Sequence, residues 1–146
     1  MNIYPSETII QSGNIKEIVC KENGRSFYLK NKSKFYINKI KVDGKLIKKG
    51  IRCDYAVDVN NQANISDCIY LIELKGSDKS HACEQILQTY IYFNDQYETK
   101  NYNCRIVLSK DNAPKLLSTE YKKLLQLEKQ KKINLIIKSQ KIEETI

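Results

Sequence analysis

The sequence predicts an α/β domain in which a central mixed β-sheet is flanked by helices. Apolar runs of strand length occur at residues 51–57, 69–75, 104–108 and 133–137. The stretches between the last three runs carry apolar side chains at helical spacing. Strands joined through helices pair in parallel, whereas strands joined by turns can pair antiparallel, and this chain has both kinds of connection.

The first fifty residues are predicted to contain a short helix and two strands. The helix is expected around residues 15–19. Apolar and polar side chains alternate in residues 25–30 and 34–42, which is typical of half-buried strands. The Asp-Gly pair that follows favours a turn before the strand at residues 51–57.

Two helices are expected in the second half of the chain. Residues 58–67 are polar and are expected to form a loop ahead of the strand at 69–75. Serine and aspartate residues after that strand can cap a helix that runs to about residue 93. Pro114 is expected to open the second helix, which ends in the basic run 129–132.

The composition favours a polyanionic partner. The chain has 146 residues, which suits a single domain over residues 1–146, and 25 basic against 17 acidic side chains give a net charge of +8. Residues 51–109 are the exception, with 5 basic and 8 acidic side chains. An acidic centre in a basic protein fits a metal-dependent enzyme acting on a phosphate backbone. A lysine-rich protein without such a partner is the alternative.

The cysteines and the hydropathy pattern indicate a cytoplasmic protein. The five cysteines lie at least 15 residues apart and form no C-x-x-C pair, which argues against a structural zinc site. They are expected to be small buried side chains in a reducing compartment. No apolar stretch suits a signal peptide or a membrane span, so no membrane partner is expected.

The strand at residues 69–75 carries two charged side chains at its end. Side chains alternate along a strand, so Glu73 and Lys75 point to the same face. Asp54 stands 19 positions earlier, in the preceding apolar run. Two carboxylates and an amine at the ends of adjacent strands suit a hard divalent cation and an activated water.

A purely structural interpretation of the same residues stays open. The Glu-x-Lys pattern occurs three times in this lysine-rich chain, so the triplet alone carries little information. Glu73 and Lys75 could form an ion pair at the strand end, and Asp54 could meet Arg52 or a loop amide. The apolar residues before Glu73 and the glycine after Lys75 favour the metal site.

The arrangement of Asp54 and the Glu-Leu-Lys triplet at 73–75, with a helix directly after it, resembles the PD-(D/E)XK nuclease superfamily. This group includes restriction endonucleases, Holliday-junction resolvases and DNA-repair nucleases. The likeness covers roughly residues 15–108 and implies a restriction-endonuclease-like core of helix, three strands, helix and strand. The proline that gives the motif its name is absent, because arginine and cysteine precede Asp54.

The resemblance also implies roles for single residues. Asp54 and Glu73 would bind Mg²⁺, for which Mn²⁺ can substitute, together with the carbonyl of Leu74. Lys75 would orient or deprotonate the attacking water. Some members carry a catalytic glutamine in the helix after the motif. Gln85 is the candidate for that role, although the Q-x-x-x-Y spacing is not present.

Other charged residues have roles that the sequence leaves open. Some superfamily members carry a glutamate in an N-terminal helix, and Glu17 is the candidate here. The lone histidine, His81, begins the helix beside the site and is more typical of a polar first-turn residue. Lys45, Lys48 and Lys49 belong to a lysine-rich stretch and are expected to contact DNA, although lysines on a strand edge also prevent aggregation.

These observations predict a magnesium-dependent endonuclease that hydrolyses phosphodiester bonds in DNA. RNA as the substrate, exonuclease action, the sequence specificity and the biological pathway stay open. Cutting both strands of a duplex would call for a homodimer. The alternatives are a non-catalytic nucleic-acid- or protein-binding module on the same fold, and a structural or inhibitor protein whose basic surface meets an acidic partner.

Overall fold

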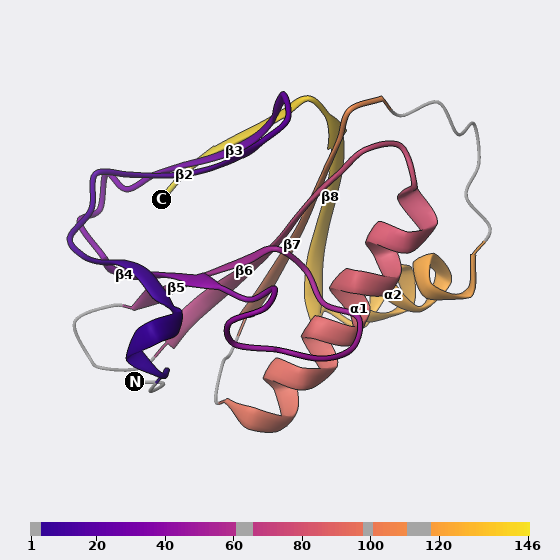
Figure 1. The fold of residues 1–146 in the computed structure, drawn as a ribbon, viewed down its shortest axis with the longest axis horizontal. Helices are drawn as coiled ribbons and strands as arrows, with labels where there is room; N and C mark the ends of the chain where they lie inside the picture. Colours follow the sequence, from indigo (N-terminus) through magenta and orange to yellow (C-terminus); the bar gives the residue numbers. More distant parts are fainter. Residues whose placement is uncertain (1–3, 61–65, 98–100, 111–117) are drawn as a thin grey trace.

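The structure, a computed structural model, describes residues 4–60, 66–97, 101–110 and 118–146. It is an α/β fold with a six-stranded sheet, a three-stranded sheet and two α-helices (Figure 1). The elements in chain order are a 3₁₀ turn at Ser6–Thr8, β1 Ile9–Gly13, β2 Glu17–Glu22, β3 Arg25–Lys30, β4 Tyr36–Lys41, β5 Tyr55–Asn60, β6 Ser66–Lys75, α1 Lys79–Gln96, β7 Asn101–Leu108, α2 Thr119–Lys129, β8 Ile133–Ser139 and β9 Lys141–Thr145.

The six-stranded sheet is mixed, as the sequence predicts. Its strand order is β1-β4-β5-β6-β7-β8. Strands β1, β4, β5 and β6 pair antiparallel, and β6, β7 and β8 pair in parallel through α1 and α2. Strand β6 therefore has an antiparallel neighbour on one side and a parallel neighbour on the other, and the carboxyl end of such a strand is a common place for a binding site.

The two faces of this sheet are covered differently, and Figure 1 shows the helices on one side and the three-stranded sheet on the other. On the helix side, Ile69 and Leu71 of β6 join the core with Ile86 and Phe93 of α1. The opposite face packs against the small sheet β2-β3-β9, and its core contains Ile18, Phe27, Leu29, Tyr70 and Ile72. Alternate residues of each central strand thus enter different cores.

The small sheet corrects one expectation of the sequence analysis. The helix expected at residues 15–19 is wrong, because these residues lead into β2, which pairs with β3. Ile18 and Cys20 are buried while Glu17 and Lys21 are exposed, so the burial period is two. The last element, β9, pairs in parallel with β3 and was not expected from the sequence.

Two boundaries also differ from the sequence analysis, and a third expected boundary lies outside the described residues. The strand expected at 51–57 begins at Tyr55, so Asp54 precedes it. The loop expected from residue 58 begins later, because Asp58–Asn60 still pair with β4 and β6. The second described helix begins at Thr119, and Pro114 lies outside the described residues.

A buried ion pair joins the two sheets. Arg105 of β7 is 3% exposed and points to the small sheet, where its Nε and Nη2 atoms donate to the Glu144 carboxylate of β9 at 2.5 and 2.8 Å. The guanidinium also donates to the carbonyl of Asn134 and lies over the Tyr70 ring. Neither described helix is long and apolar enough to cross a bilayer.

Candidate active site

Asp54 and Glu73 lie close together at one edge of the large sheet. Strands β5 and β6 pair antiparallel with Tyr55 opposite Ile72, and Asp54, the residue before β5, donates its amide to the Ile72 carbonyl. The Asp54 carboxylate is near enough to Glu73 to raise the pKa of that group. Leu71 faces the helix side of the sheet, and alternation along β6 puts Glu73 and Lys75 on the same side.

Backbone hydrogen bonds hold Asp54 in place. Its Oδ2 atom accepts from the Leu74 amide at 2.9 Å, and its own amide donates to the Ile72 carbonyl at 3.2 Å. The Asp54 carbonyl accepts from the amide of Val42 at 3.1 Å. Asp54 is therefore fixed between β6 and the segment after β4. Arg52, the alternative partner considered from the sequence, pairs instead with Asp43 at 2.8 Å.

Glu73 is a buried carboxyl group whose hydrogen bonding is incomplete. The residue is 2% exposed, and its Oε1 atom has no hydrogen-bond partner among the described residues. Burial, followed by the neighbouring Asp54 carboxylate, raises the pKa of Glu73 to about 9, and the Lys75 ammonium opposes this shift. A carboxylate in this position is stable only with added positive charge nearby.

Lys75 supplies positive charge near Glu73 but forms no ion pair with a described residue. Its charge acts on Glu73, yet within the described part of the chain no carboxylate oxygen lies within 4.0 Å of its ammonium. The strand-end ion pair that the structural interpretation called for is therefore not formed. Lys75 is half-buried, and its backbone carbonyl accepts from the Ser109 amide at 3.2 Å, which ties the end of β6 to the end of β7.

Helix α1 supports the segment that carries Asp54. Gln85 Nε2 donates to the Arg52 carbonyl at 3.1 Å, and the Cys53 amide donates to Thr89 Oγ1 at 2.8 Å. Thr89 Oγ1 in turn donates to the Gln85 carbonyl at 2.7 Å. The Oε1 atom of Gln85 is buried and has no partner among the described residues. Gln85 thus lies beside the site as expected, and Thr89 is a supporting residue that the sequence did not reveal.

The other candidates lie elsewhere. Glu17 is exposed on β2, in the sheet that covers the face opposite the site, so it does not lie on a helix as the resemblance implied. His81 lies in the first turn of α1, where its Nδ1 atom is 3.5 Å from Glu84. Lys45, Lys48 and Lys49 are exposed on the loop between β4 and β5, the segment that leads to Asp54.

Two carboxyl groups at this site, those of Asp54 and Glu73, could ligate a metal ion. No cluster of three or more His, Cys, Asp or Glu residues that could hold a metal is found within the described residues. Mg²⁺ needs only one or two protein carboxylates, because water and phosphate oxygens complete its coordination. The Oε1 atom of Glu73, which has no hydrogen-bond partner among the described residues, could serve as one of these ligands. Asp54 and Glu73 therefore fit a magnesium ion.

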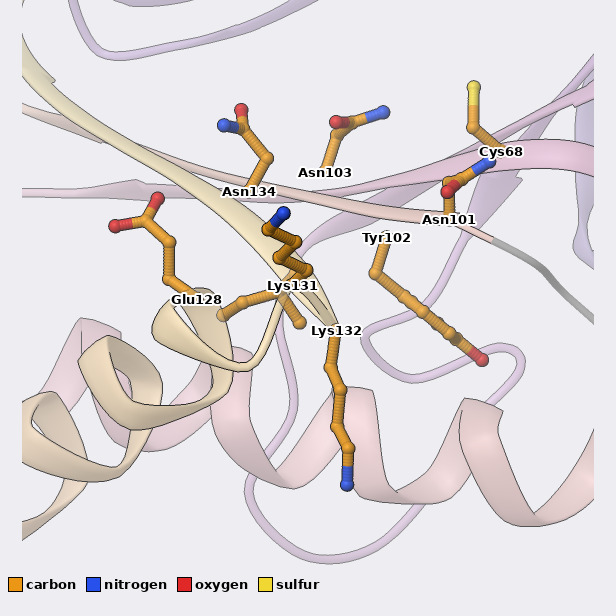
Figure 2. Close-up of a pocket in the computed structure, with 9 residues that line it drawn as sticks. Cys68, Asn101, Tyr102, Asn103, Glu128, Lys131, Lys132 and Asn134 are labelled. Carbon is orange, nitrogen blue, oxygen red and sulfur yellow. The ribbon is translucent and has the colours of Figure 1, made fainter.

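A hollow lies at the end of the parallel strands that is remote from Asp54 and Glu73. It has a volume of about 490 Å³ and is lined by the starts of β7 and β8 and by the end of α2. Figure 2 shows Asn103 and Asn134 on one side of the sheet, with Tyr102 and Lys132 pointing to the other side. Its polar side chains diverge, so this hollow has no converging set of groups for a reaction.

Comparison with protein-family models, with curated proteins and with solved structures gives no significant match to this chain.

Proposed function

We propose that this protein is a metal-dependent nuclease that hydrolyses phosphodiester bonds in DNA. The observation that carries the proposal is the pair of neighbouring carboxyl groups, Asp54 and Glu73, with a buried Glu73 oxygen that lacks a partner among the described residues. A buried carboxyl of this kind destabilises the fold, and such groups are typical of functional sites. A divalent cation would displace the proton of Glu73 and offset the negative charges of the two carboxylates.

The order of the elements supports the PD-(D/E)XK resemblance. Strands β4, β5 and β6 form an antiparallel meander, α1 follows, and β7 pairs in parallel with β6. This is the order of three strands, helix and strand that the resemblance implies. The first helix of that core has no counterpart at residues 17–22, which form β2 and pair with β3.

Each group has a distinct role in the proposed reaction. Asp54 and Glu73, with the Leu74 carbonyl, would hold Mg²⁺, which neutralises the scissile phosphate and acidifies a water molecule. Lys75 orients the attacking water and places positive charge where negative charge develops, a contribution on the order of 3 kcal/mol for one preorganised donor. Gln85 and Thr89 keep the Asp54 segment in register with β6.

Exposed lysines on the loop that leads to Asp54 would position the substrate. Lys45, Lys48 and Lys49 project from the loop that leads to Asp54, and the net charge of +8 favours binding to a phosphate backbone. These contacts carry no sequence information by themselves. Cleavage of both strands of a duplex would require two copies of the chain, which sedimentation on DNA can detect.

The test is a cleavage assay on plasmid, linear, single-stranded and branched DNA and on RNA. We expect cleavage with Mg²⁺ or Mn²⁺ and none with EDTA. Asp54→Asn, Glu73→Gln and Lys75→Met should each lower the rate by at least about 100-fold, since each removes a group used in the transition state. Glu17→Gln removes an exposed carboxylate outside the site and should cleave at the natural rate.

Two results would contradict the proposal. One is cleavage that persists in both Asp54→Asn and Glu73→Gln. The other is a protein that binds nucleic acid equally well in EDTA and in Mg²⁺ but cleaves none of these substrates, which would identify a binding module.

A further inference from the structure

Two lysines and a tyrosine gather where β4 ends and β5 begins, next to Asp54. Lys41 is directly opposite Tyr55 in the antiparallel pair of β4 and β5, and Lys39 lies two residues before Lys41. The ammonium groups of Lys41 and Lys39 are 4.5 and 5.1 Å from the centre of the Tyr55 ring. The two cations are therefore held around one aromatic side chain, and we call them the Lys39–Lys41 cluster.

The cluster lies on the face of the large sheet that packs against the small sheet. Lys39 is opposite Val57, which belongs to the core between the two sheets, and directly opposed residues share a face. The Nζ atom of Lys39 donates to the Val19 carbonyl of the edge strand β2 at 2.6 Å, which fixes this cation in place. An ammonium group has three N–H donors, so this contact leaves two of them for a ligand.

Backbone contacts and electrostatics place the cluster beside Asp54. Lys41 is followed by Val42, whose amide donates to the Asp54 carbonyl at 3.1 Å. Burial raises the pKa of the Cys20 thiol to about 12, while the Lys39 ammonium lowers it and the Asp54 carboxylate raises it further. The Lys41 ammonium also lowers the pKa of this thiol. The two lysines and Asp54 are thus close to the same buried side chain, at the edge of the sheet that carries the candidate active site.

The two ammonium charges have no carboxylate partner. Neither Lys39 nor Lys41 has a carboxylate oxygen within 4.0 Å among the residues that the structure describes. Glu22, two residues beyond Cys20 on β2, is exposed and forms no ion pair with this part of the chain either. Both lysines are half-buried. Neighbouring like charges repel each other, and an anion that contacts both would offset this repulsion.

We propose that the Lys39–Lys41 cluster binds a second phosphate of the nucleic-acid strand that is cleaved at the candidate metal site. The identity of the ligand rests on the proposed nuclease function. Because the Tyr55 ring is partly buried and lies near both ammonium groups, the cluster suits a phosphate better than a stacked base. Glu73 points to the helix side and the cluster to the other side, so the bound strand runs across the strand ends. The lysines bind substrate and take no part in the bond-breaking step.

The test measures binding in EDTA, without cleavage. Affinities for fluorescein-labelled single-stranded and duplex DNA of about 20 nucleotides are determined over a range of salt concentrations, because each phosphate contact contributes about 0.7 or 0.9 to the slope of log K against log salt. The double variant with Lys39→Gln and Lys41→Gln should lower this slope by about that amount and weaken binding about tenfold at about 0.1 M salt. The control with Lys123→Gln and Lys129→Gln makes the same charge change on exposed residues of α2 and should leave the slope unchanged.

The outcomes separate this inference from the proposed function. Natural slope and affinity in the double variant, or an equal loss in the α2 control, would overturn the second phosphate site even if the protein cleaves DNA. A slope reduced only in the double variant would support the site, and a natural chain that binds DNA in this way but cleaves nothing would refute the nuclease alone. A natural chain that binds neither probe would overturn the site, whatever the cleavage assay shows.

A single substitution guards against loss of folding in the double variant. Lys41 forms no hydrogen bond or ion pair with a residue that the structure describes, so Lys41→Gln should fold even if the loss of the Lys39 contact with β2 is not tolerated. Lys41→Gln should then lower the slope, whereas Lys41→Arg keeps the charge and should retain it. Equal slopes in these two variants would overturn the site.

Discussion

Replacing Glu73 by glutamine should make the protein more stable at neutral and alkaline pH. The folded state holds a proton on Glu73 up to about pH 9, whereas the ordinary pKa of a glutamate is 4.5. Between these values the unfolded chain releases the proton and the folded chain keeps it. The free energy of unfolding contributed by Glu73 is therefore highest below pH 4.5 and decreases as the pH rises toward 9.

The magnitude follows from the size of the pKa shift. One pKa unit corresponds to about 1.4 kcal/mol, so Glu73 should reduce the free energy of unfolding by about 4 kcal/mol between about pH 5 and pH 8. A glutamine side chain at this position bears no titratable group, and the variant should lose this part of the pH dependence. At about pH 4 the two proteins should be nearly equal in stability, because Glu73 is then protonated in the folded state and in most unfolded chains.

Urea unfolding at several pH values, in EDTA, measures this difference. The stability of Glu73→Gln minus that of the natural chain should grow steadily from about pH 5 to pH 8. The same substitution at the exposed Glu17 serves as the control and should change stability by less than about 0.5 kcal/mol. A constant difference across the pH range, or a variant that is less stable than the natural chain at alkaline pH, would refute the argument that Glu73 is an uncompensated buried carboxyl.

Three further outcomes follow from the packing. Arg105→Ala should lower the free energy of unfolding by about 3 kcal/mol, because it leaves Glu144 without its buried partner. Lys30→Ala removes only an exposed pair with Glu143 and should cost less than about 1 kcal/mol. Equal losses in urea unfolding would argue against the sheet-joining role of Arg105. Thr89→Val should lower the free energy of unfolding by about 1–3 kcal/mol, because it removes the partner of the Cys53 amide. It should also slow cleavage more than Thr89→Ser does. Similar cleavage rates in the two variants would show that Thr89 does not support the site. In the native protein, Cys53 and Cys104 should resist a thiol reagent at mildly alkaline pH, while the half-buried Cys68 reacts first. Burial raises the pKa of the Cys104 thiol to about 12 and the pKa of Cys53 well above its usual value. Fast labelling of Cys104 would show that the core around it is open to the reagent.

The central part of the fold could be predicted because its signals are local. The apolar run before Glu73, the capping residues before α1 and the alternation along β6 each depend on residues close in sequence. The same alternation placed Glu73 and Lys75 on one face. These elements carry the candidate site, so its location followed from the sequence.

The small sheet could not be predicted because its partners are distant in sequence. Ile15, Ile18 and Val19 have the three- and four-residue spacing of a helix, yet β2 pairs with β3 over its whole length and β3 pairs with β9 at the other end of the chain. Such non-local pairing overrides local propensity.

The electrostatics of the site likewise required the structure. Sequence shows that Glu73 follows a buried strand, but its 2% exposure and its unpartnered oxygen depend on how α1 and the Asp54 segment pack over it. The support given by Thr89 to the Cys53 amide is also a contact between segments far apart in the chain. Neither has a signature in residue spacing.

Direct measurement of Mn²⁺ binding tests the central claim that Asp54 and Glu73 together hold one divalent cation. Calorimetric titration of the natural chain near neutral pH, without nucleic acid, should show one bound Mn²⁺ and the release of a proton from Glu73. Asp54→Asn and Glu73→Gln should each abolish this binding, while Glu17→Gln retains it. Binding that survives in both site variants would contradict the account.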